Sequence, residues 1–395
     1  MSQTIHSSEV QAADQASVAP RRRTLLRGLL GVAAAAALPG VALAPASGQA
    51  LGPMLPAPPQ SSATEADRAE WAGFRSRFIT AEGRVVDTAN GGISHSEGQG
   101  YAMLMAEWTN DRATFERLLN WTRAHLRRPN DALFAWRWSS NPQVARDTNS
   151  ATDGDIVIGW ALQRAAERWS VPAWHTMAAA IARDVLRLSV REVAGRTVLL
   201  PGPHGFEKQE FVVLNPSYYN TPALRALARL APSPAWAKLE ADGKWLMTAA
   251  RFGRWDLPAD WIELNRRTGA VSPAAEWAPR FSWDAIRVPL FQAWAGECQA
   301  PALGAALNFW TNATPGRLPA WTDLRTGALA PYAGHAGVSA IANLSYNAKS
   351  GFGQKAAIPS VARATDYYGA ALVMLARIAQ QEGPAAARPQ MMASL

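Results

Sequence analysis

A succession of segments with helical periodicity is the feature that most limits how this chain of 395 residues can fold. Apolar residues recur at helical spacing from residue 67 onward, and Gly, Pro and Asn residues separate one segment from the next. No Rossmann glycine fingerprint or phosphate-binding loop occurs, and strands do not alternate with helices as a parallel sheet requires. The pattern predicts a single all-α domain with helices near residues 67–80, 98–109, 111–128, 155–169, 172–190, 221–230, 235–252, 283–296, 301–312, 334–347 and 364–381.

One stretch departs from the helical pattern. The runs RTVLLPG at 196–202 and EFVVLNPSYY at 210–219 are short, rich in β-branched or aromatic residues, and bounded by Pro and Gly. These runs predict a small β-hairpin inserted between two helices.

The composition is that of a globular protein, because 48% hydrophobic and 18% charged residues can build a large core, which excludes a disordered chain. The single cysteine, Cys298, excludes an internal disulfide and a thiolate metal cluster. A formal net charge of +8 raises the question of nucleic-acid binding, but no nucleic-acid-binding motif is present. We therefore expect no nucleic-acid partner, no metal and no cofactor.

The N-terminal region has the three-part order of an export signal. Residues 21–27 read RRRTLLR, an alanine-rich apolar run follows, and the small residues ALAPASGQA end at residue 50. The pair Arg22 and Arg23 resembles the twin-arginine signal, whose cargo crosses the membrane already folded. The apolar run is too short for a transmembrane helix. We expect residues 1–50 to be removed on export and the mature protein, without a membrane span, to be periplasmic or secreted.

Two short segments flank the predicted domain, which we place at residues 67–385. Residues 51–66 are rich in Pro and Ser and have no apolar period, so they are predicted to form a linker. Residues 386–395 are predicted to form a flexible tail.

Three acidic residues stand near predicted loop-to-helix junctions. Glu97 in NGGISHSEGQGYAMLMAEW lies among glycines and is either an N-terminal cap or part of a site. Asp153 lies in RDTNSATDGDIVIGWAL, whose acidic spacing does not fit a calcium loop. Asp284 in RFSWDAIRVPLF precedes Arg287 by three positions, which is compatible with a local ion pair on a solvated helix or with a site.

Together, these positions predict helices whose amino ends converge on one groove. Two carboxyl groups facing a sugar, one protonated and one ionised, are what hydrolysis of a glycosidic bond requires. The 17 Trp residues fit this chemistry, because aromatic faces stack on the apolar faces of pyranose rings, although most of them are expected to pack the helices.

The segments around these acidic residues resemble those of glycoside hydrolase family 8. SEGQGYAMLM and ATDGDIVIGWAL are similar to two specific signatures of the family, and SWDAIR is similar to a shorter third one. NPSYY and TDYYGAAL are similar to segments that line the family's cleft, and the similarity runs from Trp71 to Ala379. The resemblance implies an (α/α)6 barrel with an open substrate groove and an inverting mechanism.

The resemblance also implies roles for individual residues. Glu97 would be the general acid and Asp284 the general base, with the two carboxyl groups ~6.5–9.5 Å apart to admit a water molecule. If Asp284 is not the base, the fallback carboxylates are Glu207, Glu210 and Glu263. The residues expected to bind substrate are Asp153, Trp136, Tyr218, Arg287, Trp138 and Tyr367. As the acid, Glu97 is expected to have a raised pKa.

The implied activity is that of an endo-β-1,4-glucanase on cellulose-like chains. ISHSEGQG is most similar to the branch of the family found beside the cellulose synthase of cellulose-secreting bacteria, so association with such a complex is expected. Xylan and chitosan remain alternative substrates. A non-catalytic glucan-binding accessory protein and a polysaccharide lyase are the alternatives from other classes.

Overall fold

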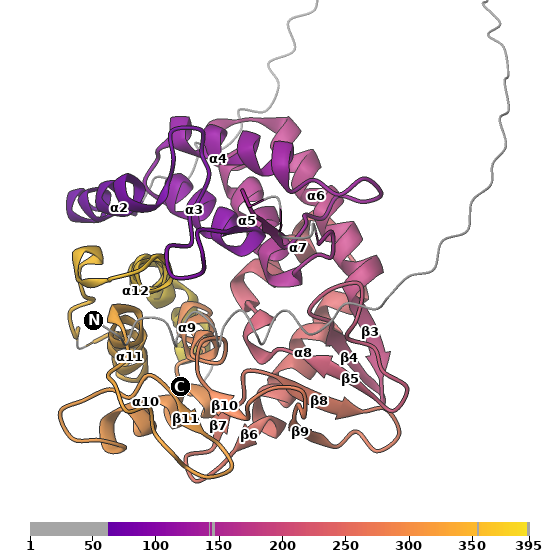
Figure 1. Ribbon diagram of the computed structural model, residues 1–395, viewed down its shortest axis with the longest axis vertical. Coiled ribbons are helices and arrows are strands. Elements are labelled where there is room, and N and C mark those ends of the chain that lie inside the picture. The colour runs from indigo at the N-terminus through magenta and orange to yellow at the C-terminus, as the bar shows by residue number, and fades with distance from the viewer. Residues whose placement is uncertain (1–61, 142, 144–146, 354, 393–395) are drawn as a thin grey trace, which may run out of the picture.

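The computed structural model describes residues 62–141, 143, 147–353 and 355–392. The predicted export signal and most of the predicted linker lie outside the described residues. Within these residues the chain forms the following α-helices (Figure 1): α2 (Glu65–Phe78), α3 (Ser96–Trp108), α4 (Arg112–His125), α5 (Thr152–Trp169), α6 (Pro172–Ser189), α7 (Thr221–Leu230), α8 (Pro234–Ala249), α9 (Arg287–Trp294), α10 (Pro301–Asn312), α11 (Ala336–Lys349) and α12 (Tyr367–Met392). None of the helices in this part of the chain has the length and hydrophobicity that crossing a bilayer requires.

The helices form an inner and an outer layer. Helices α3, α5 and α9 are buried around nearly their whole circumference, as is the first half of α12. Helix α6 is typical of the outer layer, because it buries only the stripe of Ala178, Ile181, Ala182 and Val185. The inner helices contact one another in the order α3, α5, α7, α9, α11, α12 and back to α3. The core therefore lies within a closed ring of helices.

Side-chain caps decide where several helices begin. Thr64 and Asp67 form a reciprocal capping box, so α2 begins at Glu65, inside the segment predicted as linker. Asp111 caps α4 through the backbone N–H of Thr114. At the other end of the domain, α12 continues to Met392, into the segment predicted as a flexible tail.

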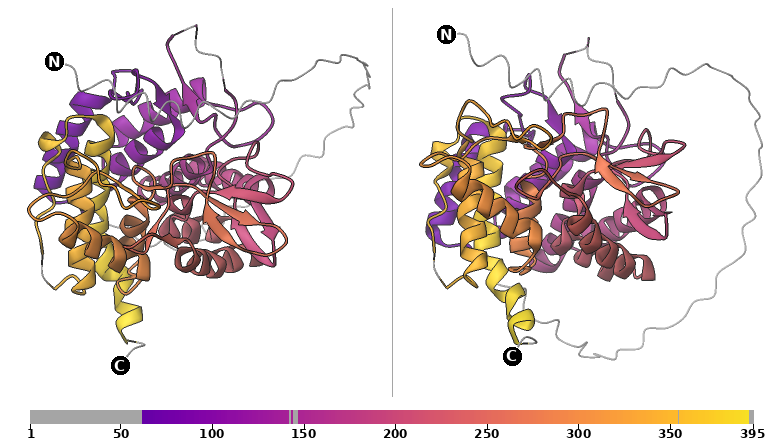
Figure 2. Two further views of the ribbon diagram at one scale, coloured as in Figure 1. Left: turned by 60° about the horizontal axis from the view of Figure 1, so that its bottom comes forward. Right: turned by 90° about the horizontal axis from the view of Figure 1, so that it is seen from below.

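A small β-hairpin does lie between α6 and α7, but the predicted pairing of the two runs with each other was wrong. Strand β4 (Arg196–Leu199) pairs with β3 (Val190–Val193), whereas β5 (Phe211–Leu214) pairs with β8 (Ile262–Asn265). The reason is local: Ala194 and Gly195 both have positive φ, which closes a tight hairpin directly before Arg196. Strand β9 (Val271–Pro273) completes the sheet by pairing with β8, and these strands lie together on one flank of the helices (Figure 2).

Three shorter ladders hold the loops at the end of the ring where α3 and α5 begin. They are β1 (Ser94–His95) with β2 (Arg137–Trp138), β6 (Arg251–Phe252) with β7 (Leu257–Pro258), and β10 (Arg280–Phe281) with β11 (Thr322–Asp323). A 3₁₀ turn, η1 (Pro216–Tyr218), contacts α9. These loops surround the cleft described next.

Candidate active site

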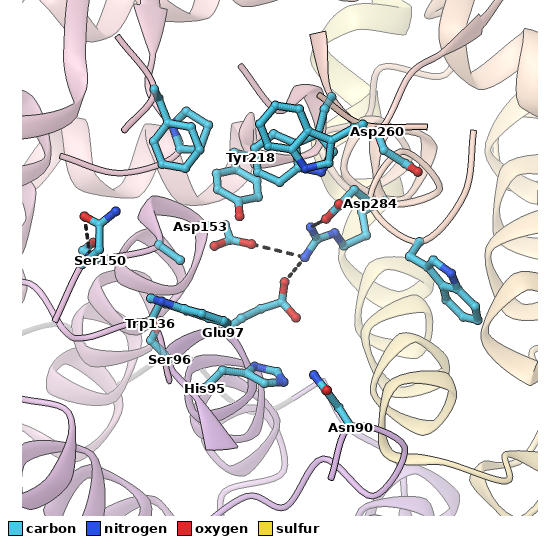
Figure 3. A pocket seen from close by; sticks show the side chains of 18 of the residues that line it. Asn90, His95, Ser96, Glu97, Trp136, Ser150, Asp153, Tyr218, Asp260 and Asp284 are labelled. Carbon is cyan, nitrogen blue, oxygen red and sulfur yellow. Dashed lines mark hydrogen bonds and ion pairs between the residues drawn. The ribbon is translucent and has the colours of Figure 1, made fainter. Parts of the chain in front are cut away.

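An open cleft lies at the amino ends of α3 and α5 (Figure 3). Acidic and aromatic side chains from segments far apart in the sequence line it together. The lining residues include Asp87, Asn90, His95, Glu97, Trp136, Asp147, Asp153, His204, Phe206, Tyr218, Asp260, Trp261, Trp277, Arg280, Trp283, Asp284, Arg287 and Tyr368.

Glu97 reaches the cleft because it is in the first turn of α3. His95 caps this helix: its Nδ1 accepts a hydrogen bond from the backbone N–H of Gly98 at 3.0 Å. The same ring therefore carries its proton on Nε2, which faces Asp87 Oδ2 at 3.4 Å. Asp87 and His95 together hold the start of α3, and with it the Glu97 side chain, at the wall of the cleft.

Gly154 allows the start of α5 to lie against the start of α3. A Cβ atom at this position would contact Ser96 Oγ and would lie 2.7 Å from the backbone nitrogen of Glu97, so a larger residue cannot be accommodated without movement. This close approach places Asp153 beside Glu97. Glycine is therefore required at position 154 by the close approach of the two helices and not by a turn.

Arg287 brings the three predicted acidic residues together. Arg287 is the first residue of α9 and is only 2% exposed. Its Nη1 contacts Glu97 Oε2 and lies 3.3 Å from Asp153 Oδ2, and its Nη2 lies 2.5 Å from Asp284 Oδ1. Figure 3 shows the three carboxyl groups turned toward this point. The alternative of a local ion pair on a solvated helix is therefore excluded.

Asp284 lies in a turn and not, as predicted, within a helix, since α9 begins at Arg287. The turn is held by backbone hydrogen bonds from Ile286 N to Ser282 O and from Arg287 N to Asp284 O, at 3.1 and 3.0 Å. The carboxyl group of Asp284 projects from this turn toward Arg287 and the cleft.

One cation for three buried carboxyl groups leaves negative charge in excess, and the pKa values reflect this. Burial and the neighbouring charge of Glu97 raise the pKa of Asp153 well above its ordinary value. Burial, opposed by Arg287 and supported by Glu97, raises the pKa of Asp284. Burial also acts to raise the pKa of Glu97, but Arg287 and His95 outweigh it, and the pKa of Glu97 is lowered.

The expectation of a raised pKa for Glu97 was therefore wrong. Arg287 pairs directly with Glu97 and lowers its pKa, whereas burial and the charge of Glu97 raise the pKa of the adjacent Asp153. Two neighbouring carboxyl groups that share a proton titrate as a pair, and the local cation decides which of them holds it.

Tyr218 and Trp136 line the cleft, as their predicted roles require. Tyr218 in η1 lies edge-on to Trp261, with ring centroids 6.3 Å apart. The ring of Trp136 is held in place by Asp147, whose Oδ2 accepts a hydrogen bond from the indole N–H at 2.6 Å. The guanidinium of Arg137 lies 4.7 Å from the centroid of the same ring.

Trp138 and Tyr367, both predicted to bind substrate, lie outside this lining. Trp138 packs edge-on against Trp121 at 5.5 Å between ring centroids. Tyr367 is fully buried and contacts Phe74, Phe78 and His95. The neighbouring Tyr368 lines the cleft instead, and its hydroxyl donates to the backbone oxygen of Trp283 at 2.5 Å. Successive residues of a helix point about 100° apart, so the YY pair alone could not show which ring faces the cleft.

Sequence reasoning missed part of the aromatic wall. Trp261 stacks on Trp277 with centroids 4.9 Å apart and on Phe206 at 6.0 Å. These residues come from loops without periodicity, so no pattern separated them from the tryptophans of the core.

The fallback carboxylates lie away from the cleft. Glu207 pairs with Arg191 and Arg266 on the surface, and Glu263 accepts a hydrogen bond from the backbone of Ala275. Glu210, which precedes β5, is also outside the lining. Among the described residues, no group of His, Cys, Asp and Glu side chains has the arrangement of a metal site.

Known proteins are similar to this chain in sequence and in fold. Residues 52–382 match the family described as "Glycosyl hydrolases family 8". A probable endoglucanase of Novacetimonas hansenii is 44% identical over 321 residues, which cover 81% of this chain and 92% of the relative. An endoglucanase of Cellulomonas uda is 41% identical over 276 residues, covering 69% of this chain and 76% of the relative.

Solved structures of endoglucanases have the same fold as this chain. The endo-β-1,4-glucanase CMCax of Acetobacter xylinum superposes with a TM-score of 0.76 at 44% identity and covers 81% of this chain and 99% of its own. Endoglucanase Cel10 of Klebsiella pneumoniae, a family 8 glycosyl hydrolase, superposes with a TM-score of 0.73 at 38% identity and covers 80% and 99%. The predicted (α/α)6 barrel is thereby confirmed. On the match over residues 52–382 and the closeness of these relatives, the chain belongs to glycoside hydrolase family 8.

Proposed function

We propose that this protein is an inverting endo-β-1,4-glucanase that hydrolyses cellulose-like chains. The observation that carries the proposal is the convergence of Glu97, Asp153 and Asp284 on Arg287 within an open cleft lined by aromatic rings. The relatives named endoglucanase, at 44% and 41% identity, support the choice of substrate.

In the proposed reaction Asp153 supplies the proton that Glu97 needs. The pKa of Asp153 is raised and that of Glu97 is lowered, so Asp153 is the proton donor of the pair, and transfer of its proton to Glu97 yields a neutral Glu97 and an ionised Asp153. The new negative charge on Asp153 is stabilised by Arg287 Nη1 at 3.3 Å. Asp153 then offers a carboxylate to the hydroxyl groups of the bound sugar.

The two remaining carboxyl groups carry the hydrolysis. Neutral Glu97 donates its proton to the glycosidic oxygen as the bond to the anomeric carbon breaks. Ionised Asp284 accepts a proton from the water molecule that attacks the same carbon from the opposite face, which inverts its configuration. Arg287 bonds Asp284 through Nη2, which holds this carboxylate toward the reacting atoms.

The openness of the cleft and its aromatic wall support an endo mode of action. Trp136, Trp261, Trp277 and Trp283 all line it and offer faces for successive sugar rings. A groove with aromatic platforms along it accepts a polymer anywhere along its length, whereas a closed pocket accepts only a chain end.

Parallel assays test the proposal. Carboxymethylcellulose, xylan and chitosan are incubated with the wild type and with Glu97→Gln, and proton NMR follows the first anomer released from cellopentaose. We expect release from carboxymethylcellulose with the α-anomer appearing first. Activity on xylan alone would reject the glucanase, and an inert wild type that still binds cello-oligosaccharides would favour the accessory protein.

We further propose that residues 1–50 direct export of the folded protein, and that it acts beside a cellulose synthase complex. The Arg22–Arg23 pair and the apolar run after it support export. In cell fractionation, replacement of both arginines by lysine should retain the protein in the cytoplasm. Unchanged export of that variant would contradict the twin-arginine route.

A further inference from the structure

Asp260 lies in the wall of the cleft beside Asp284, between β7 and β8 (Figure 3). Its carboxyl group is directed at the turn that carries Asp284. Oδ1 accepts hydrogen bonds from the backbone N–H of Ser282 at 3.0 Å and of Ala285 at 2.8 Å, and Oδ2 bonds Ser282 Oγ. In addition, the backbone N–H of Asp260 donates to Arg280 O at 2.8 Å.

These contacts distinguish Asp260 from the carboxyl groups that face Arg287. Both of its oxygens are engaged by the 282–285 turn, and the side chain is 7% exposed, so it is not available to activate a water molecule. What it can do is hold the residues on either side of Asp284. Because Asp284 precedes the first turn of α9, its position depends on this turn.

We propose that Asp260 is a positioning residue, which fixes the 282–285 turn and thereby places the Asp284 carboxylate for attack by water. The inference rests on the proposed function, in which Asp284 is the general base. Displacement of a reacting group by about 1 Å is enough to cost ~100-fold in rate, so a clamp of this kind matters for turnover even though it touches no substrate.

The charge state of Asp260 suits this role. Burial and the charge of Asp284 raise the pKa of Asp260 to about 7. Below that pH Asp260 is neutral, and it does not compete with Asp284 for the negative charge. An asparagine reproduces the neutral form: its oxygen can accept from Ser282 N and Ala285 N, and its amide group can donate to Ser282 Oγ.

The test compares Asp260→Ala with Asp260→Asn on cellopentaose. Asp260→Ala should lower kcat by about 100-fold with KM unchanged, because the clamp is lost while the sugar contacts remain. Asp260→Asn should recover kcat to within about tenfold of the wild type, and it should leave the acid limb of the pH profile in place. If the alanine variant does not fold, Asp260→Ser, whose hydroxyl is too short to bridge both N–H groups, replaces it.

Asp111→Ala is the matched control. Asp111 also bonds a backbone N–H, that of Thr114, together with the side chains of Trp71 and Arg75, but it does so in the outer layer. Its loss should lower the melting temperature and leave kcat unchanged. A similar melting temperature for Asp111→Ala and Asp260→Ala separates the effect on turnover from a general loss of stability.

Several outcomes would overturn the inference. The inference fails if Asp260→Ala, or Asp260→Ser in its place, keeps kcat within about threefold of the wild type. It also fails if the variant raises KM, because a raised KM would indicate that Asp260 contacts the sugar. An asparagine variant as inactive as the alanine variant would show that the carboxyl group itself reacts, and a lowered acid limb would show that it acts through charge. Asp284→Asn separates the two levels: if it stays active, the base assignment fails, whatever Asp260 does.

Discussion

The two ends of α3 and α5 use charge in opposite ways. At the cleft end, Glu97 and Asp153 share the single cation Arg287 with a third carboxyl group. At the far end, Glu107 of α3 pairs with Arg164 and Arg168 of α5.

At the far end the positive and negative charges balance. Arg164 also bonds Glu382 of α12 at 2.8 Å, and Glu382 accepts a hydrogen bond from Trp294 Nε1 at the same distance. Two carboxylates therefore meet two guanidinium groups, and this network ties the four helices α3, α5, α9 and α12 together. At the cleft end three carboxyl groups meet one guanidinium, and burial together with the neighbouring negative charge raises the pKa of Asp153 and of Asp284. The excess of negative charge thus creates a proton donor at one end, while balance at the other end creates a structural joint.

The largest effect is expected from Glu97→Gln. Loss of the general acid should lower kcat on cellopentaose by about 10³- to 10⁴-fold, with little change in the melting temperature. Reducing-sugar release measures the rate. A variant that keeps a tenth of the wild-type kcat would contradict the assignment.

Glu107→Gln should have the opposite effect at the other end of the same helix. The substitution removes the negative charge that pairs with the buried Arg164 and Arg168. The free energy of unfolding should therefore fall by about 3–5 kcal/mol while kcat is unchanged. Urea unfolding followed by circular dichroism measures the loss. A large fall in kcat in the folded variant would mean that the two ends are not independent.

Gly154→Ala should disturb the cleft end without removing a charge. The added Cβ would lie against the backbone of Glu97, so kcat should fall by about 100-fold through displacement of that residue. Gly159→Ala in the same helix is the control, because its Cβ would meet Leu227 Cδ2 at 2.9 Å, within the packing of α5 against α7. The control should cost about 1–3 kcal/mol of stability and leave kcat intact. Equal kcat values for the two variants would contradict the explanation of Gly154.

The smallest effect concerns pH. Burial raises the pKa of Asp155 to about 8, and burial and Asp284 raise that of Asp260 to about 7, both from the ordinary value of 3.8. The folded state therefore binds these protons more tightly than the unfolded state, and the stability they contribute is lost progressively as pH rises from the ordinary pKa of 3.8 to the folded values of about 7 and about 8.

The melting temperature should accordingly fall by a few degrees between pH 6 and pH 9. Asp155→Asn keeps an acceptor for the backbone N–H of Phe134 but cannot ionise, so it should flatten this dependence. An equally steep fall in that variant would assign the effect to other groups.

Much of the site could be predicted because its determinants are local. The glycines and acidic residues of the first two signatures mark helix starts, and α3 and α5 do begin at Ser96 and Thr152. Less could be predicted where the outcome depends on a partner far away. The pairing of β5 with β8 joins residues about fifty positions apart, and the choice of Tyr368 over Tyr367 depends on how α12 sits against α3 and α9.

The sequence alone determined which residues form helices, at which end of each helix the carboxyl groups stand, and which family the motifs resemble, because periodicity, capping and residue type are properties of short segments. Only the tertiary structure decided which carboxyl group has a lowered pKa and which has a raised one. Glu97 and Arg287 are separated by 190 residues, yet they are in contact, and a pKa depends on the distance to such charges and on burial. For this reason the lowered pKa of Glu97 and the raised pKa of Asp153 became visible only once the ring of helices had closed around them.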